Sequence, residues 1–268
     1  MAGEIWTLLG TNLAVMIVVM TLISIPSFTT RDPSYIDAFW GIGFVVIAFS
    51  SYVQTDGDPA RKGWLLGLCA LWGFRLGGYL LWRWRKNGPD PRYQAILASR
   101  EDGSEKVFIW RRVFLVQAFV LTLTALPVQL GQVYGEPVGL TALNWAGVAL
   151  ALFGIVFEST ADLQLARFKG DPANHGQVMD KGLWFNTRHP NYFGETCTWW
   201  GLFLVAVVNG ATVFAALGPA IITFFLLKVS GVGLLEKGLK KSKPAYQDYI
   251  DTTSAFVPLP KKKAQVSA

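Results

Sequence analysis

Long apolar stretches constrain the fold of this chain more than any other feature. A helix needs about 20 apolar residues to cross roughly 30 Å of hydrocarbon. Seven stretches reach or approach that length, at residues 7–27, 37–53, 64–83, 112–130, 141–161, 191–209 and 211–235. The sequence therefore predicts an all-α integral membrane protein, folded as a bundle of seven transmembrane helices.

The composition agrees with a membrane protein. Only 16% of the residues are charged, whereas soluble domains carry about 25%. The eleven tryptophans suit membrane–water interfaces. The first apolar stretch follows the acidic Glu4 and not a basic segment, so we expect a span there and not a cleaved signal peptide. We interpret residues 1–268 as one membrane domain with a cytoplasmic tail at 236–268.

The net charge of +6 reflects topology rather than nucleic-acid binding. With alternating sides, one side of the membrane holds 20 of the 24 lysines and arginines, and the opposite loops hold Arg61 and Lys62. Cytoplasmic loops carry this excess, and it also attracts anionic lipid. We therefore expect the N-terminus outside and the C-terminus in the cytoplasm.

Several chemistries are not indicated. Cys69 and Cys197 lie in predicted spans as inert thiols, and the two histidines alone are too few for a metal site. There is no P-loop and no nucleophile elbow. The lone Gly41-Ile42-Gly43 is too weak a pattern to predict a dinucleotide site.

Charged residues within spans cost at least about 2.5–3.5 kcal/mol each, so each one suggests a function. Asp37 opens the second span, as a functional residue or as an interfacial N-cap. Arg75 lies in the third span and shares a helix face with Tyr79, four residues on. Glu158 and Asp162 share a face of the fifth span, as part of a site or as a structural ion pair.

The stretch RHPNYFGE at 188–195 introduces the sixth span. Pro190 suits the first turn of a helix. Arg188 and the free N–H groups of that turn suit a phosphate. Three residues at a spacing of four form a stripe with Tyr192 alongside: Asn191, Glu195 and Trp199. This pattern predicts a cofactor with an anionic tail and a reactive ring. The alternative is a capped helix at the lipid interface.

The C-terminal segment LLEKGLKKSKPAYQDYIDTTSAFVPLP is amphipathic, aromatic and basic. It either lies on the inner leaflet or folds over the cytoplasmic mouth of the bundle and closes the site. In the second case Glu236, Tyr246 and Tyr249 are the candidate contacts.

These residues carry a family resemblance. GLWFNTRHPNYFGETCTWWGLFL at 182–204 resembles the signature of the DUF1295 family, in the membrane steroid 5α-reductase superfamily. The segments 90–96, 157–169 and 230–258 are similar to further blocks of that family. The resemblance implies an NADPH-dependent reductase with a seven-helix bundle. We expect it in the bacterial inner membrane and as a monomer, although the sequence itself does not reveal the oligomeric state. The cofactor would enter from the cytoplasm and a lipophilic substrate from the bilayer.

The resemblance also implies roles for individual residues. Asn191, Glu195 and Trp199 match positions that contact the cofactor and its nicotinamide end. Asp162 matches an aspartate that faces the cofactor, and Lys169 falls where reductases carry a phosphate-binding residue. Arg188 and His189 resemble the sterol-reductase version of the block. The implied cofactor-binding set is completed by Tyr192, Glu236, Tyr246 and Tyr249.

The chain departs from the superfamily at the substrate end. Steroid 5α-reductases polarise an enone with a Gln-Glu pair and a tyrosine, and the pair has no counterpart here. Asp37 is the nearest acidic residue, Trp72 falls at the tyrosine position, and Tyr79 matches a nearby one. The expected catalytic residues are Asp37, Tyr79 and Glu195. They would assist hydride transfer to the β-carbon of a lipophilic enone, followed by protonation.

A second enzyme class shares part of the pattern. Membrane methyltransferases that use S-adenosylmethionine carry RHP-x-Y-x-G and a tyrosine-rich tail. Asn191 and Glu195 after the RHP favour the reductases. A non-catalytic lipid- or sterol-binding bundle is a third interpretation.

Overall fold

A computed structural model of the protein describes residues 2–100, 103–229 and 232–262. Over these ranges the chain is helical and contains no β-strand. The all-α prediction is therefore confirmed. The chain divides into two compact units, Met1–Val148 with Leu202–Gly218, and Ala149–Gly201 with Pro219–Ala268.

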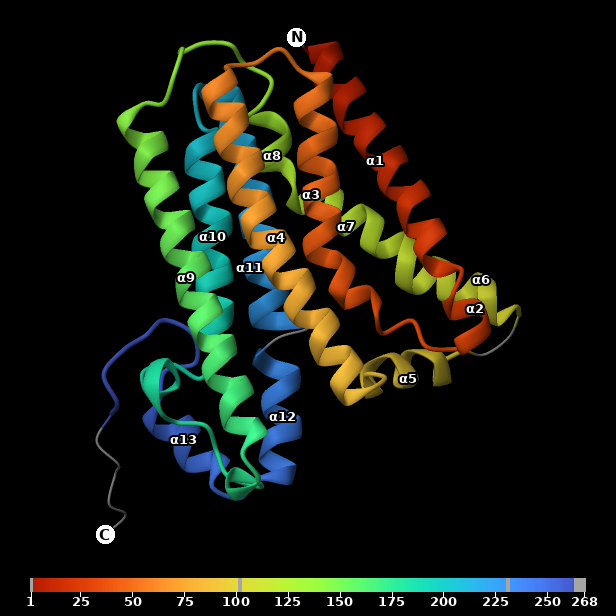
Figure 1. Ribbon diagram of the computed structural model, residues 1–268, viewed down its shortest axis with the longest axis vertical. Coiled ribbons are helices and arrows are strands. Elements are labelled where there is room, and N and C mark those ends of the chain that lie inside the picture. The colour runs from red at the N-terminus through yellow and green to blue at the C-terminus, as the bar shows by residue number, and fades with distance from the viewer. Residues whose placement is uncertain (1, 101–102, 230–231, 263–268) are drawn as a thin grey trace. The chain divides into compact units, whose positions relative to one another are not determined.

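The helices appear in chain order in Figure 1. The first unit holds α1 (Ala2–Ser24), α2 (Ser27–Thr30), α3 (Ile36–Gln54), α4 (Pro59–Asn87), α5 (Pro91–Ala98), α6 (Glu105–Ile109), the π-helical η1 (Trp110–Leu115), α7 (Val116–Thr124), α8 (Leu126–Leu130) and the 3₁₀ segment η4 (Gly210–Ala216). The second unit holds most of α9 (Ala142–Gly170), α10 (Pro190–Ala206) and α11 (Leu217–Phe224), with η2 (Pro172–Asn174), η3 (Gly182–Phe185), the π-helical η5 (Phe225–Val229), α12 (Val232–Ser242) and α13 (Tyr246–Thr252).

Six helical stretches in the described ranges are long and apolar enough to cross a membrane: Ala2–Ser24, Ile36–Gln54, Pro59–Asn87, Glu105–Thr124, Ala142–Gly170 and Gly210–Val229. Each overlaps one predicted span. The remaining predicted span, 191–209, corresponds to α10, which has 17 residues and so lies at the lower end of the crossing length. A seventh span and the orientation of the termini stay predictions.

Two predicted spans are not continuous α-helices. The span at 112–130 contains η1 and ends at Thr124, after which α8 starts as a separate helix with Pro127 in its first turn. Proline lacks the N–H that would continue the earlier helix. The span at 211–235 begins with 3₁₀ geometry in η4 and continues through α11 into η5.

Arg61 and Lys62 were expected in a loop but lie in the first turn of α4, which Asp58 caps. Arg61 is completely buried. Its guanidinium donates to three backbone carbonyls, those of Gly131, Tyr134 and Pro137. A buried charge is tolerated when hydrogen bonds replace its hydration, so this arginine fastens the start of α4 to the segment after α8.

The backbones of α3 and α4 touch where two glycines face each other, and Figure 1 shows the two helices side by side. A Cβ atom on Gly41 would lie 2.2 Å from the carbonyl oxygen of Gly73, and one on Gly73 would lie 2.4 Å from that of Gly41. Small residues permit such close approach between helices in lipid. Gly41 therefore serves helix packing.

A buried polar network joins α1, α3 and α8. Asn12 Nδ2 donates to Ser51 Oγ at 2.9 Å and to Gln129 Oε1 at 3.0 Å. Gln54 Nε2 donates to Asn12 Oδ1 at 3.1 Å. Hydrogen bonds between membrane helices contribute about 0.6–2 kcal/mol each, so the network adds specificity to the packing of the first unit.

We expect Gly73→Ala to destabilise the protein by about 1–3 kcal/mol, because the added methyl overpacks a backbone contact. Gly67→Ala in the same helix is the matched control, since a Cβ there meets nothing within 4 Å. Thermal unfolding in detergent, followed by circular dichroism, compares the two. Equal midpoints for both variants would contradict the close contact of α3 and α4.

Candidate functional site

In the second unit, α9 and α10 approach closely at two glycines. A Cβ atom on Gly154 would lie 2.5 Å from the carbonyl oxygen of Gly194, and one on Gly194 would lie 2.6 Å from the backbone nitrogen of Glu158. Glu158 is almost completely buried. The close crossing therefore brings the acidic face of α9 against the first turns of α10.

One turn beyond this crossing, Asn191 and Asp162 meet. Asn191 Nδ2 donates to Oδ1 of the buried Asp162 at 3.3 Å. The amide oxygen of Asn191 is buried and accepts no hydrogen bond from the described part of the chain. A buried acceptor of this kind is costly unless a donor reaches it. It is therefore one of the buried polar atoms in this unit that a donor on an incoming ligand would satisfy.

The predicted stripe lies on one helix, because α10 runs from Pro190 to Ala206. Glu195 is partly exposed one turn after Asn191, and Trp199 is completely buried one turn further. On α9 the helix continues to Gly170, so Lys169 extends the face of Asp162 as predicted and its side chain is exposed.

Arg188 and His189 both contact Glu236. Arg188 Nε donates to Glu236 Oε1 at 2.7 Å, and His189 Nε2 lies 3.1 Å from the same oxygen. Burial raises the pKa of Glu236, but the hydrogen bonds and charges of His189 and Arg188 outweigh it and hold that pKa below its usual range. His189 also stacks on Tyr192, with ring centroids 5.4 Å apart. This cluster ties the start of α10 to α12.

Arg188 also holds the C-terminal tail. Its Nη1 donates to the carbonyl oxygens of Ile250, at 2.9 Å, and Thr253. The guanidinium thus has backbone and carboxylate partners on the tail side. A phosphate contact for Arg188 stays a prediction.

The tail folds back onto residues 184–189. The backbone nitrogen of Arg188 donates to Ser254 O at 2.9 Å, and Thr187 Oγ1 donates to Phe256 O at 2.8 Å. The buried Tyr249 donates its hydroxyl to the carbonyl oxygens of Trp184 and Thr187. The tail therefore packs on this segment of its own unit, and closure of a site by the tail stays a prediction.

The segment that receives the tail is itself fastened to α9. Trp184 Nε1 donates to Ala161 O at 3.1 Å, and the backbone nitrogen of Leu183 donates to Gln164 Oε1 at 2.9 Å. Gly182 has a φ of +61°, and a Cβ there would lie 2.6 Å from the amide of Gln164. The site residues therefore sit on a continuous series of contacts from α9 through 182–189 to α13.

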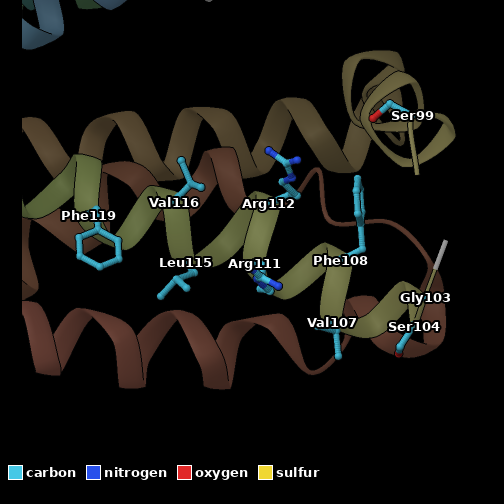
Figure 2. Close-up of a pocket in the computed structure, with 10 residues that line it drawn as sticks. All are labelled: Ser99, Gly103, Ser104, Val107, Phe108, Arg111, Arg112, Leu115, Val116 and Phe119. Atoms are coloured by element: carbon cyan, nitrogen blue, oxygen red, sulfur yellow. The ribbon is translucent and has the colours of Figure 1, made fainter. Parts of the chain in front are cut away.

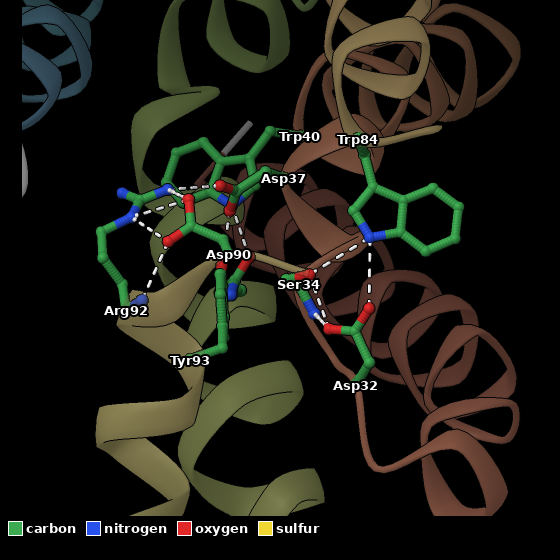
Figure 3. A network of polar contacts seen from close by, with 9 residues as sticks. Asp32, Ser34, Asp37, Trp40, Trp84, Asp90, Arg92 and Tyr93 are labelled. Atoms are coloured by element: carbon green, nitrogen blue, oxygen red, sulfur yellow. Dashed lines mark hydrogen bonds and ion pairs between the residues drawn. The ribbon is translucent and has the colours of Figure 1, made fainter. Parts of the chain in front are cut away.

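In the first unit, Asp37 lies in a separate network (Figure 3). Arg92 Nη2 donates to Asp37 Oδ2 at 2.7 Å, and Tyr93 donates its hydroxyl to Asp37 Oδ1 at 2.5 Å. Asp37 is the second residue of α3, whose N-cap is Tyr35, so the N-cap interpretation is wrong. Burial and the Asp37 carboxylate raise the pKa of Tyr93, which keeps the hydroxyl a donor.

Sequence reasoning about single residues missed Arg92 and Tyr93. No pattern in the sequence around α5 marks these two residues, and the only signal was the family resemblance of residues 90–96. Both oxygens of Asp37 accept hydrogen bonds, so it would have to give up one of these contacts to act as a proton donor.

The predicted catalytic residues are distributed over both units. Asp37 and Tyr79 belong to the first unit, and Glu195 belongs to the second. Tyr79 lies on α4 and stacks on Trp82 at 5.9 Å between ring centroids. The structure brings together Asn191 with Asp162 and Arg188 with His189 and Glu236. Within the described ranges, no group of three or more His, Cys, Asp or Glu residues could hold a metal ion.

We expect Tyr249→Phe to loosen the tail, because the substitution leaves two carbonyl oxygens without their donor. A loss of about 1 kcal/mol raises the open population about fivefold. Limited proteolysis of the tail measures this population. Tyr246→Phe is the matched control, since its hydroxyl donates to no described residue while its ring packs against Tyr249. Equal cleavage rates in both variants would contradict the role of the Tyr249 hydroxyl.

The Glu236 cluster predicts a pH dependence. Because its folded pKa lies below the unfolded value of about 4.3, its contribution to stability is complete above that value and is lost as the pH falls through the folded pKa. The midpoint difference between wild type and Glu236→Gln should be constant above about pH 5 and shrink below pH 4. Thermal unfolding across pH 3–6 measures it. A difference independent of pH would count against the ion pair.

Comparison with known proteins identifies the family of this chain. The family described as "Protein of unknown function (DUF1295)" matches residues 6–253. The "Uncharacterized protein C594.04c" of Schizosaccharomyces pombe is 25% identical over 267 residues, which cover 87% of this chain and 74% of that protein. No solved structure matches significantly. The chain belongs to the DUF1295 family.

Proposed function

We propose that this protein is an NADPH-dependent membrane reductase that saturates a carbon–carbon double bond in a lipophilic, steroid-like or other enone. The observation that carries the proposal is the buried amide oxygen of Asn191, which lies beside Asp162 and accepts no hydrogen bond from the described residues. The carboxamide of a nicotinamide ring has the N–H donors that this oxygen requires. A buried acceptor that has no donor within the described ranges is chemically suited to such a group.

The remaining residues of the second unit fit the rest of the cofactor. Glu195 and Trp199 follow Asn191 on α10 and would border the ring. The N-terminus of α10 and the exposed Lys169 would favour the phosphates. NADPH over NADH follows from this basic character, because a 2′-phosphate needs cationic partners.

When bound, NADPH supplies the hydride. The chain's own residues orient the ring through Asn191 and Asp162, and the tail excludes water through Tyr246 and Tyr249. Glu195 is the acid we propose to return a proton to the reduced substrate. The roles of Asp37 and Tyr79 at an enone oxygen stay predictions, and within the first unit Arg92 and Tyr93 hold Asp37.

The cellular setting is part of the proposal. The substrate would enter from the bilayer into a single membrane domain, and the cofactor from the cytoplasm. We propose a monomer in a bacterial inner membrane, with the N-terminus outside and the tail in the cytoplasm.

A methyltransferase using S-adenosylmethionine is the alternative. Its adenine amino group would also donate to Asn191, so the amide oxygen alone does not separate the two cofactors. The partly exposed Glu195 one turn further favours the reductase, because a proton source is needed there and a methyl transfer needs none.

The direct test is cofactor binding by the detergent-purified full chain, followed through tryptophan fluorescence. We expect micromolar binding of NADPH and at least tenfold weaker binding by Asn191→Leu, a loss of about 1.4 kcal/mol or more. Asn186→Ala, an exposed asparagine of the same unit, should bind as wild type does. NADH and S-adenosylmethionine are titrated in parallel.

Three results would count against the proposal. Selective binding of S-adenosylmethionine would move the search to methyl acceptors. Binding that survives Asn191→Leu would place the nucleotide elsewhere. If NADPH binds, pH–rate profiles with an enone substrate then examine the acid, and a Glu195→Gln variant with the wild-type profile would exclude Glu195.

A further inference from the structure

A cavity of about 910 Å³ lies in the first unit, beside the start of the candidate span Glu105–Thr124 (Figure 2). This volume is within the range of about 300–1,000 Å³ that is typical of ligand pockets. Its lining combines two arginines, Arg111 and Arg112, with apolar side chains of the same helical stretch. None of these residues contributes to the site proposed above.

The lining residues form two parallel stripes, because residues four apart share a helix face. One stripe consists of Phe108, Arg112 and Val116. The other consists of Val107, Arg111 and Leu115. Figure 2 shows Arg112 and Val116 on one flank of the helix and Arg111 and Leu115 on the other. Each guanidinium is therefore followed, one turn further into the span, by an apolar side chain.

The groove changes from charged to apolar along the span. Arg111 and Arg112 come first along the chain, and Val116 and Phe119 follow them further into the span. Val116 and Phe119 are 49% and 45% exposed. The π-helical geometry of η1 at the arginines is itself frequent at functional sites. This layout matches an amphiphile with its head at the arginines and its chain along the apolar part.

The charge of the groove selects an anion. Among the described residues at this end of the groove, Glu105 is a carboxylate that already pairs with Arg31 and Arg100, each at 3.3 Å. The guanidinium groups of Arg111 and Arg112 are exposed. Each offers the planar fork that binds phosphate oxygens in pairs. The hydroxyls of Ser99 and Ser104 line the same end.

We propose that this groove binds one anionic phospholipid, with its phosphate between Arg111 and Arg112 and an acyl chain along Val116 and Phe119. The bound lipid lies in the leaflet that adjoins this end of the span. The proposal concerns the first unit alone and stands whether or not the protein reduces an enone.

The test is native mass spectrometry of the detergent-purified full chain, titrated with phosphatidylglycerol, phosphatidylcholine or inorganic phosphate. We expect one phosphatidylglycerol to bind at least tenfold more tightly than phosphatidylcholine. The Arg111→Gln/Arg112→Gln variant should lose that tenfold preference. Arg85→Gln removes an exposed arginine outside the groove and should retain it.

A second variant separates the groove from general attraction between charges. Val116→Trp keeps both arginines but fills the path of the acyl chain, so it should also weaken phosphatidylglycerol at least tenfold. If the arginine variant does not fold, Val116→Trp alone tests whether the lipid binds in the groove.

Four results would overturn the proposal. These are equal binding of the two lipids, wild-type binding by Val116→Trp, wild-type binding by a folded arginine variant, and displacement of the lipid by millimolar inorganic phosphate, which would reduce the site to a simple anion site.

Discussion

Helices in hydrocarbon gain little by burying apolar side chains against each other, since the lipid is equally apolar. Association then depends on how closely the backbones approach. In the second unit that approach occurs at Gly154 and Gly194, where no room exists for a Cβ atom. The contact between Asn191 and Asp162 lies on the same two helices, one to two turns away. A wider crossing would separate the amide from the carboxylate, so the geometry of the candidate site follows from two missing side chains.

The Arg-His-Pro segment at residues 188–190 holds other parts of the second unit in place, in addition to its proposed role in binding a cofactor. Arg188 and His189 converge on Glu236, and Arg188 also holds the backbone of the tail. The tail in turn covers residues 184–189, which are fastened to α9. One arginine side chain therefore contacts both α12 and the backbone of the tail.

The sequence predicted the location of the helices well, because the length of an apolar stretch determines it. It predicted the contacts of individual polar side chains less well, because those depend on distant partners. Apolar runs locate six candidate spans, because the thickness of a bilayer imposes a minimum length. The stripe through Asn191 and Glu195 was predicted because helical spacing is regular. The position of Arg61 was not, since its three carbonyl partners lie about seventy residues further along the chain.

The polar contacts within the first unit could not be predicted from sequence patterns either. Asn12 and Gln129 are uncharged, so nothing marked them as buried partners. The position of Asp37 at the start of a span suggested a helix cap, but its carboxylate accepts hydrogen bonds from Arg92 and Tyr93 of α5. In each case the deciding interaction joins residues far apart in sequence, and local propensity contains no information about it.

Arg61 has a consequence for how the protein is made. Synthesis delivers α4 to the membrane before residues 131–137 exist, yet the carbonyl oxygens that solvate the buried guanidinium belong to that later segment. Until it emerges, the cation must stay in contact with water or lipid headgroups. The buried position of Arg61 at the start of α4 therefore depends on a segment that is synthesised about seventy residues later.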